Sequence, residues 1–345
     1  MLTTLLSSRS LSLVALLGCL VPLGVSGAGP AESGPGAESI DAGRWLSRIN
    51  SAARERNYQG TMVFTTGGAV SSSKVAHFCV GDQSFERLEA LDGKMRKVYR
   101  HNETVHTVWP QAGVAVVERR SALSNLPSTL QSVDPRALEQ YELKSEGRER
   151  IAGRDAQVFL LQPRDEWRFA QRVWADQASG LMLRADVIGP GRTVLESAAF
   201  SEVEIGVKPQ PDSILQAVRK LDGLKVLRPQ QTGTQLEAEG WILKPLLPGF
   251  RLASCVRRLL DPRAATSAST SNSAEVLQAI FSDGLTHVSL FIEPFDAARH
   301  RKDLSTQIGA THTLMLRRGD FWLTAMGDVP PTALRHLVDA VERRR

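Results

Sequence analysis

Ser71 and Lys74 have the Ser-x-x-Lys spacing of a serine nucleophile with its lysine base. That chemistry requires a helix start that aims the serine at the lysine, together with Lys-Thr-Gly and Ser-Asp-Asn segments elsewhere in the chain. Here the pair lies in a stretch of strand-like alternation, and neither companion segment occurs. A hydrolase that uses this pair is a hypothesis that the surrounding sequence does not favour.

Metal chemistry is the second candidate, because His101 and His106 flank Glu103. Without further ligands at matching spacing, these residues are more typical of a polar strand surface. Beyond the N-terminus only Cys79 and Cys255 remain as cysteines, and neither has a second cysteine or a histidine at ligand spacing. They could form one disulfide in an oxidising compartment, but two free thiols are favoured. We expect no metal and no cofactor.

Other catalytic patterns are missing from the 345 residues: there is no Gly-x-Ser-x-Gly, Walker loop, Gly-x-Gly-x-x-Gly or His-Glu-x-x-His. Their combined absence favours a binding protein over an enzyme. The formal net charge of +5 is mild. It fits anionic partners such as acidic peptides or lipid headgroups, and it does not favour nucleic acid.

The N-terminus has the order of an export signal: Arg9, an apolar run over 11–25, and small residues over 26–28. We expect a signal peptide over 1–27, a flexible Gly/Pro/Ala/Ser tether over 28–40, and a periplasmic location. Leu16-Leu17-Gly18-Cys19 also resembles a lipoprotein processing site, with Cys19 lipidated, but cleavage near Gly27 or Ala28 is favoured.

The periodicity of the mature chain predicts an α+β fold in two parts. One amphipathic helix over 41–57 is followed by about ten antiparallel strands, so a first domain spans 41–207. Prolines and polar residues predict a linker over 208–239, and a smaller α+β domain fills 240–345. A strongly curved sheet that wraps one helix leaves an apolar cleft that the helix only partly fills.

Several segments, in this order and spacing, resemble one known family. They are residues 149–156 (Glu-Arg-Ile-Ala-Gly-Arg-Asp-Ala), 161–165, 168–169, 181–186, 240–241, 247–250, 282–285, 288–293, 309–312 and 324–330. Together they resemble the MucB/RseB family, periplasmic negative regulators of an envelope-stress sigma factor, over nearly the whole mature chain. The sequence departs from the family at Phe169-Ala170, where Tyr-Gly is more common.

This resemblance implies a LolA-like open barrel for the first domain, a curved antiparallel sheet wrapped around a helix. It implies a non-enzymatic regulator that binds the periplasmic region of a membrane-anchored, MucA/RseA-like anti-sigma factor. Bound regulator would shield that factor from regulated proteolysis, and lipid or lipopolysaccharide would release it. A periplasmic lipid or lipoprotein carrier of the LolA type is the alternative. The sequence leaves a homodimer open.

Candidate contact residues follow from residue type. Aromatic side chains could line the cleft or the second domain's surface, and guanidinium groups suit carboxylate and phosphate. The candidates are Trp109, Phe169 and Trp174 for the cleft, Arg164 and Arg168 for anions or peptide, and Phe291 and Phe295 in the second domain. Alternatively, Arg164 or Arg168 pairs locally with Asp165 or Glu166.

Overall fold

The computed structural model describes residues 42–119, 135–259 and 275–344. The predicted signal peptide and tether therefore lie outside the described residues. Within the described part, no helix has the length and apolar character needed to cross a membrane.

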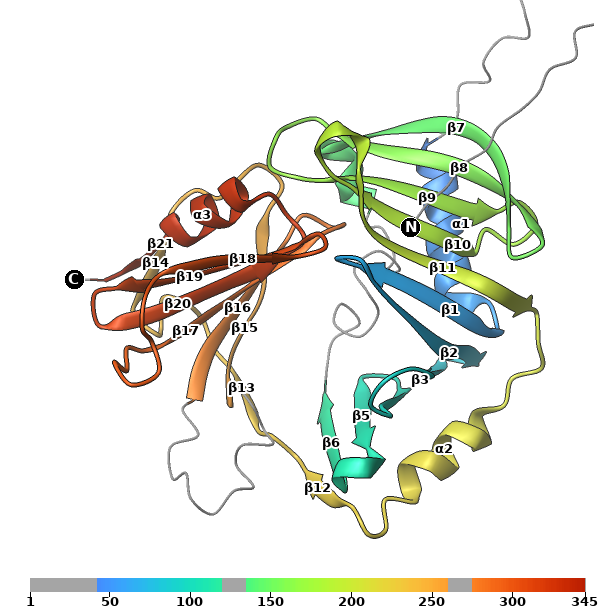
Figure 1. Cartoon of the computed structure of the whole chain (residues 1–345), viewed down its shortest axis with the longest axis horizontal. Helices are drawn as coiled ribbons and strands as arrows, with labels where there is room; N and C mark the ends of the chain where they lie inside the picture. Colours follow the sequence, from blue (N-terminus) through green and yellow to red (C-terminus); the bar gives the residue numbers. More distant parts are fainter. Residues whose placement is uncertain (1–41, 120–134, 260–274, 345) are drawn as a thin grey trace, which may run out of the picture. The chain divides into compact units, whose positions relative to one another are not determined.

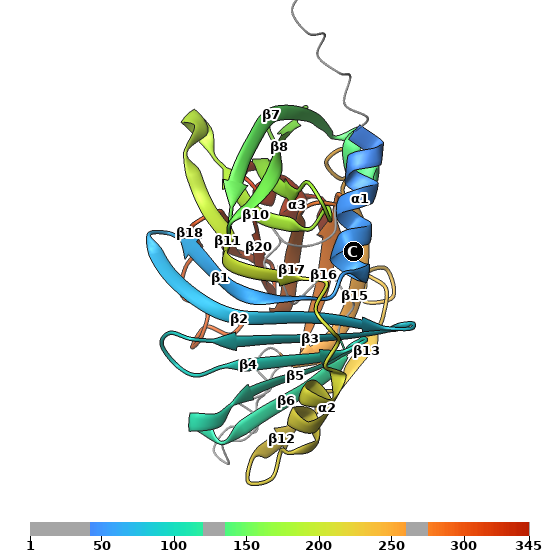
Figure 2. The same cartoon turned by 90° about the vertical axis from the view of Figure 1, so that its right-hand side faces the viewer.

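A large, mostly antiparallel sheet forms the first part of the chain (Figures 1 and 2). Its 12 strands run in the order β12-β6-β5-β4-β3-β2-β1-β11-β10-β9-β8-β7. They are β1 (Tyr58–Thr66), β2 (Ala69–Val80), β3 (Gln83–Ala90), β4 (Lys97–His101), β5 (Thr104–Trp109), β6 (Val114–Arg119), β7 (Tyr141–Ile151), β8 (Arg154–Pro163), β9 (Ala170–Asp176), β10 (Met182–Ile188), β11 (Val194–Ile205) and β12 (Lys225–Leu227). The end strands β7 and β12 do not pair with each other, so the sheet stays open.

Helix α1 (Ala42–Glu55) packs on the β8–β10 half of this sheet. A helical period that starts at Trp45 would place Trp45, Ile49, Ala52 and Ala53 on one apolar stripe, but the buried apolar residues are Leu46, Ile49 and Ala52. Trp45 is half-buried and tilts against Phe159 with ring centroids 4.9 Å apart. The stripe is rotated because Leu46 buries a flexible aliphatic chain fully, whereas the larger indole fits only at the margin.

The segment expected to be a linker is partly built into both sheets. Helix α2 (Pro211–Arg219) buries Ile214 against the β2–β6 half of the first sheet. After it, β12 pairs in parallel with β6, and β13 (Gln231–Gly233) pairs with a strand of the second sheet. Proline and polar residues suggested a linker, but a short amphipathic helix needs only one apolar face to dock. The division into independent domains stays a prediction.

A second sheet of seven strands makes up the smaller C-terminal part, in the order β13-β15-β16-β17-β20-β19-β18 (Figure 1). Its further strands are β15 (Arg251–Leu259), β16 (Glu275–Ser282), β17 (His287–Pro294), β18 (Leu304–Ile308), β19 (Thr311–Arg318) and β20 (Phe321–Gly327). Helix α3 (Pro331–Asp339) buries Leu334, Leu337 and Val338 against one face. Two short strands, β14 (Trp241–Leu243) and β21 (Val341–Arg343), pair beside it. The predicted fold class, a large N-terminal sheet with a helix and a smaller C-terminal sheet domain, is confirmed.

Candidate binding site

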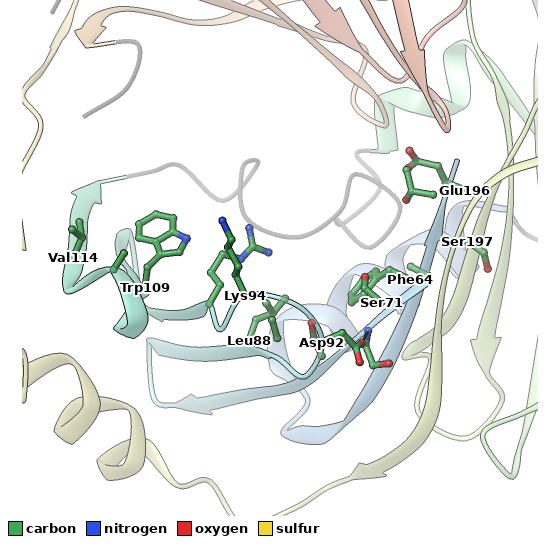
Figure 3. Close-up of a pocket in the computed structure, with 16 residues that line it drawn as sticks. Phe64, Ser71, Leu88, Asp92, Lys94, Trp109, Val114, Glu196 and Ser197 are labelled. Carbon is green, nitrogen blue, oxygen red and sulfur yellow. Dashed lines mark hydrogen bonds between the residues drawn. The ribbon is translucent and has the colours of Figure 1, made fainter. Parts of the chain in front are cut away.

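The first sheet carries a pocket of about 690 Å³ on the face opposite α2 (Figure 3). On β2, Ala76 and Phe78 pack in the α2 cluster, whereas Ser71 and Ser73 line the pocket. Because successive side chains of a strand point to opposite faces, the two sets lie on opposite sides of the sheet. The lining residues are Phe64, Thr66, Ser71, Ser72, Ser73, Leu88, Ala90, Asp92, Lys94, Arg96, Trp109, Ala112, Val114, Glu196, Ser197 and Ala198.

The pocket combines apolar lining with cations at one side. Phe64, Leu88 and Trp109 supply apolar surface, and the exposed Lys94 and Arg96 come from the turn after β3. In Figure 3, Val114 and Trp109 are drawn at one end of the lining and Glu196 at the other, with Lys94 between them. An apolar hollow with a few charged groups suits an amphiphilic ligand whose polar end is negative.

Glu196, at the far end, also contacts the second sheet. A carboxylate oxygen of Glu196 accepts a hydrogen bond of 3.2 Å from the backbone N–H of Ala310, in the β18–β19 turn. Burial raises the pKa of Glu196 to about 7, and the negative charge of Asp328 adds to the rise. The turn approaches closely because Gly309 has no side chain: a Cβ there would lie 2.5 Å from the carboxylate.

A second connection between the sheets is fully buried and centred on Asp283. One carboxylate oxygen accepts hydrogen bonds from Arg168 Nε at 2.6 Å and from the Tyr141 hydroxyl at 3.2 Å. The other accepts from the backbone N–H groups of Leu285 and Thr286 at 2.9 and 2.8 Å. All acceptor directions of Asp283 are therefore used inside the protein.

Arg168 is equally well satisfied. Its guanidinium also donates to the Asp165 carboxylate and to the Pro248 carbonyl, and it lies 5.0 Å from the Phe250 ring centre. Burial alone would lower the pKa of Arg168, but the bonds and charge of Asp283 raise it overall. Burial likewise raises the pKa of Tyr141 well above its usual value. This cluster is a structural ion pair.

Two family models match the chain: the MucB/RseB N-terminal domain over residues 41–218 and the MucB/RseB C-terminal domain over residues 235–342. The chain belongs to the MucB/RseB family. The resemblance read from the sequence is confirmed, and the chain is thereby a member of a family of regulatory proteins rather than of enzymes.

Known proteins of this family are similar over nearly the whole chain. The sigma factor AlgU regulatory protein MucB of Pseudomonas aeruginosa is 28% identical over 331 residues, 93% of this chain and 94% of the relative. The sigma-E factor regulatory protein RseB of Haemophilus influenzae is 22% identical over 311 residues, 89% of this chain and 93% of the relative.

Solved structures of MucB give the same result. The crystal structure of MucB in complex with MucA(peri) has a TM-score of 0.64 at 25% identity, covering 88% of this chain and all of that one. The complex structure of Pseudomonas aeruginosa MucA/MucB has a TM-score of 0.66 at 26% identity, covering 89% of this chain and all of that one. The similarity therefore extends across both sheets.

Of the three aromatics predicted to line the cleft, only Trp109 lines the pocket in this family member. Phe169 is buried near Val187 and Ala310, with its ring tilted against His312 at 5.9 Å. Trp174 is also buried, and its indole N–H donates to Glu149 at 2.8 Å. Spacing alone could not separate core aromatics from pocket aromatics.

Of the two predicted arginines, one is exposed and the other is buried. Arg164 is exposed at the end of β8, whereas Arg168 belongs to the buried pair with Asp283 and also contacts Asp165, the local partner considered as its alternative. Sequence reasoning missed Asp283, which lies 115 residues away from Arg168. It also missed Lys94, Arg96 and Glu196. The Asp92-Gly93 turn sequence marks the position of the first two, and nothing local marks Glu196.

Phe291 and Phe295 lie in different settings. Phe291, on β17, pairs with Thr324, and the neighbouring Leu290 belongs to the α3 core, so Phe291 lies on the face opposite α3. Phe295 packs near Trp322, with the Arg317 guanidinium 3.9 Å from its ring centre. A contact role for each candidate stays a prediction.

The residues of the catalytic and metal alternatives can be located in the described part of the chain. Ser71 lines the pocket while Lys74 lines a polar hollow on the other face of β2, so the pair cannot act together. No group of three potential metal ligands occurs in the described part of the chain. His101 stacks on Phe85 at 4.6 Å. Both remaining cysteines are free thiols.

Proposed function

We propose that this protein is a periplasmic regulator of an envelope-stress sigma factor. It binds the periplasmic region of a membrane-anchored anti-sigma factor and shields that region from regulated proteolysis. The observation that carries the proposal is the similarity to MucB across both sheets, together with solved MucB structures described as complexes with MucA(peri) or MucA.

The same proposal assigns release to a lipid or lipopolysaccharide that occupies the pocket of the first sheet. Support comes from the apolar lining around Trp109 and from the exposed Lys94 and Arg96, which suit an anionic headgroup. Linkage requires that a ligand which prefers the partner-free form lowers the affinity for the partner.

The binding test mixes the purified protein with the periplasmic segment of the anti-sigma factor encoded in the same organism. We expect association at micromolar concentration. We also expect the bound segment to be cleaved more slowly than the free segment by the protease that starts its regulated proteolysis. Absence of association at that concentration would overturn the proposal.

The release test adds lipopolysaccharide to the preformed complex. A Trp109→Ala, Lys94→Ala, Arg96→Ala variant should require more lipopolysaccharide for release, while its affinity for the segment is unchanged. The matched control is Lys74→Ala, an exposed lysine on the opposite face of the same sheet. If control and variant release alike, the pocket is not the lipid site. Vectorial transfer of lipid to acceptor vesicles would favour the carrier alternative.

A further inference from the structure

Strand β18 is the unpaired edge of the second sheet. It pairs with β19 on one side, and no strand in the described ranges pairs with its other side. All five of its residues, Leu-Ser-Thr-Gln-Ile, are exposed. Proteins usually protect such edges with charges, prolines, bulges or a covering segment. β18 contains no charge and no proline, and its register with β19 is unbroken.

The backbone groups that face the free edge follow from the hairpin geometry. Ile308 and Thr311 flank the two-residue turn that joins β18 to β19, and such a flanking pair is hydrogen-bonded across the hairpin. Hydrogen-bonded and non-bonded pairs alternate along an antiparallel ladder. The N–H and C=O groups of Ser305 and Gln307 therefore point away from β19.

A pocket of about 390 Å³ adjoins this edge on the α3 side. Ser305 and Leu314 form its strand wall, and α3 contributes Leu334 and His336. Trp167 closes it, with its ring centre 5.4 Å from that of His336. A strand added to β18 would place alternate side chains on this face, so an apolar or aromatic side chain could enter the pocket.

The charges around the edge favour an acidic partner. Arg301 and Lys302 are separated from β18 by Asp303 alone, are exposed, and form no ion pair with another described residue. Arg335 is exposed on the rim of the adjoining pocket. Of the nearby acids, Asp339 pairs with Arg318 at 2.5 Å, whereas Asp303 accepts a hydrogen bond of 3.0 Å from the Arg317 backbone N–H and keeps its negative charge. Three cations therefore face one uncompensated acid at this edge.

We propose that an extended acidic segment of the anti-sigma factor's periplasmic region adds to β18 as an eighth strand. Its acidic residues would lie opposite Arg301 and Lys302, and an apolar side chain would fill the pocket beside Ser305. The inference rests on the proposed function for the identity of the partner. The binding mode itself is inferred from β18: the outward N–H and C=O groups of Ser305 and Gln307, and the alternation that directs every second partner side chain toward the pocket.

Overlapping peptides that tile the periplasmic segment serve as probes, and binding to the full mature protein is measured by fluorescence anisotropy. We expect one acidic peptide to bind. Ser305→Pro removes an outward N–H and should weaken that binding at least about tenfold. The matched control Ser305→Ala keeps the N–H and should stay within about twofold. Charge reversal at Arg301 and Lys302 should also weaken binding and remove its salt dependence.

The ligand side gives an independent test that does not depend on the fold of Ser305→Pro. N-methylation of alternate amides in the peptide should abolish binding, whereas methylation of the intervening amides should not. If the complete segment binds but Ser305→Pro and both methylated peptides bind equally well, this inference fails while the proposed function stands. If the segment does not bind at all, both fail. Pairing of two copies through β18, seen as a concentration-dependent dimer lost in Ser305→Pro, would also overturn it.

Discussion

Two of the contacts between the two sheets, the one around Asp283 and the one at Glu196, differ in almost every physical respect. The contact around Asp283 is buried, and each polar group has its partners inside the protein. The polar part of the contact at Glu196 is a half-buried carboxyl group, one backbone N–H and a nearby like charge on Asp328, and Phe169 and Val187 pack on Ala310 beside it. Burial makes the first contact costly to break, whereas solvent and protons can reach the second.

Under the proposed function, in which the protein both holds and releases a partner, this difference gives the two contacts different roles. The Asp283 contact sits beside the α1 core, because Leu285 packs there with Leu46 and Ile49. The Glu196 contact shares its carboxyl group with the pocket of the first sheet. We therefore expect a change of pH, or a ligand bound in that pocket, to act on this contact before the buried one.

The largest expected effect is from Arg168→Met. This change keeps most of the side-chain volume but leaves the Asp283 carboxylate buried without its cation, so we expect a loss of about 3–5 kcal/mol in unfolding free energy. Urea denaturation measures it. Arg164→Met, at an exposed arginine four residues earlier, should change stability by less than about 0.5 kcal/mol.

A double variant sharpens this prediction. Replacing Asp283 as well, as Arg168→Met with Asp283→Asn, removes the unpaired charge and should recover part of the loss. A double variant that is as unstable as the sum of the two single variants would show that the ion pair is not the cause.

The second prediction concerns pH. The pKa of Glu196 is raised from 4.5 to about 7 in the folded state, so the folded state binds the proton more tightly than the unfolded state. Its contribution to stability is therefore greatest below about pH 4.5 and is lost as pH rises through about 7. Because the group is half-exposed, we expect an effect on the order of 1 kcal/mol.

Glu196→Gln isolates this effect, because the amide oxygen still accepts the Ala310 N–H and carries no charge. The difference in unfolding free energy between the variant and the native protein should favour the variant more at pH 8 than at pH 5. An unchanged difference across that range would mean that Glu196 titrates normally. Glu202→Gln, on the same strand and with no proposed role in the contact, is the control.

The third prediction tests the close approach of the β18–β19 turn. Gly309→Ala places a Cβ 2.5 Å from the Glu196 carboxylate, and Gly319→Ala has nearly the same φ, +61° against +60°, with nothing within 4 Å. Each substitution should lower the unfolding free energy by about 1–2 kcal/mol, because alanine disfavours the left-handed backbone conformation. Gly309→Ala alone should lose more unfolding free energy than this backbone cost, and it alone should weaken the pH dependence of stability that is due to Glu196. Equal thermal stabilities would show that the turn has room to move.

Sequence periodicity predicted most of the strands that bury one face, because alternation is a local signal. It does not predict β18, whose five exposed residues carry no apolar alternation, and it predicts a linker over 208–239, where Ile214 is fully buried. Glycine marks the turns at 67–68 and 177–180, so their positions in the chain can be inferred from the sequence.

The site was harder to predict than the fold. The Arg168–Asp283 pair joins residues 115 positions apart, and the pocket gathers side chains from β1 to β11. Residue type identified Arg168 and Trp174 as candidates. Nothing in the local sequence reveals that Arg168 donates its hydrogen bond to Asp283 and Trp174 to Glu149, both inside the protein. Burial and pairing are properties of the folded sheet, so they could not be inferred from composition.

The smallest expected effect comes from an ion pair that is as short as the Arg168–Asp283 pair but exposed, so it tests burial at equal distance. Lys244 and Glu342 form an ion pair at 2.5 Å, as short as the 2.6 Å contact between Arg168 and Asp283, but their side chains are 52% and 43% exposed. Solvent screens such a pair, so Lys244→Met should cost less than about 1 kcal/mol and should cost still less in 1 M NaCl. Arg168→Met should keep its full cost in salt, because the buried charge is shielded from ions. If both variants responded to salt alike, burial would not be what distinguishes the two contacts.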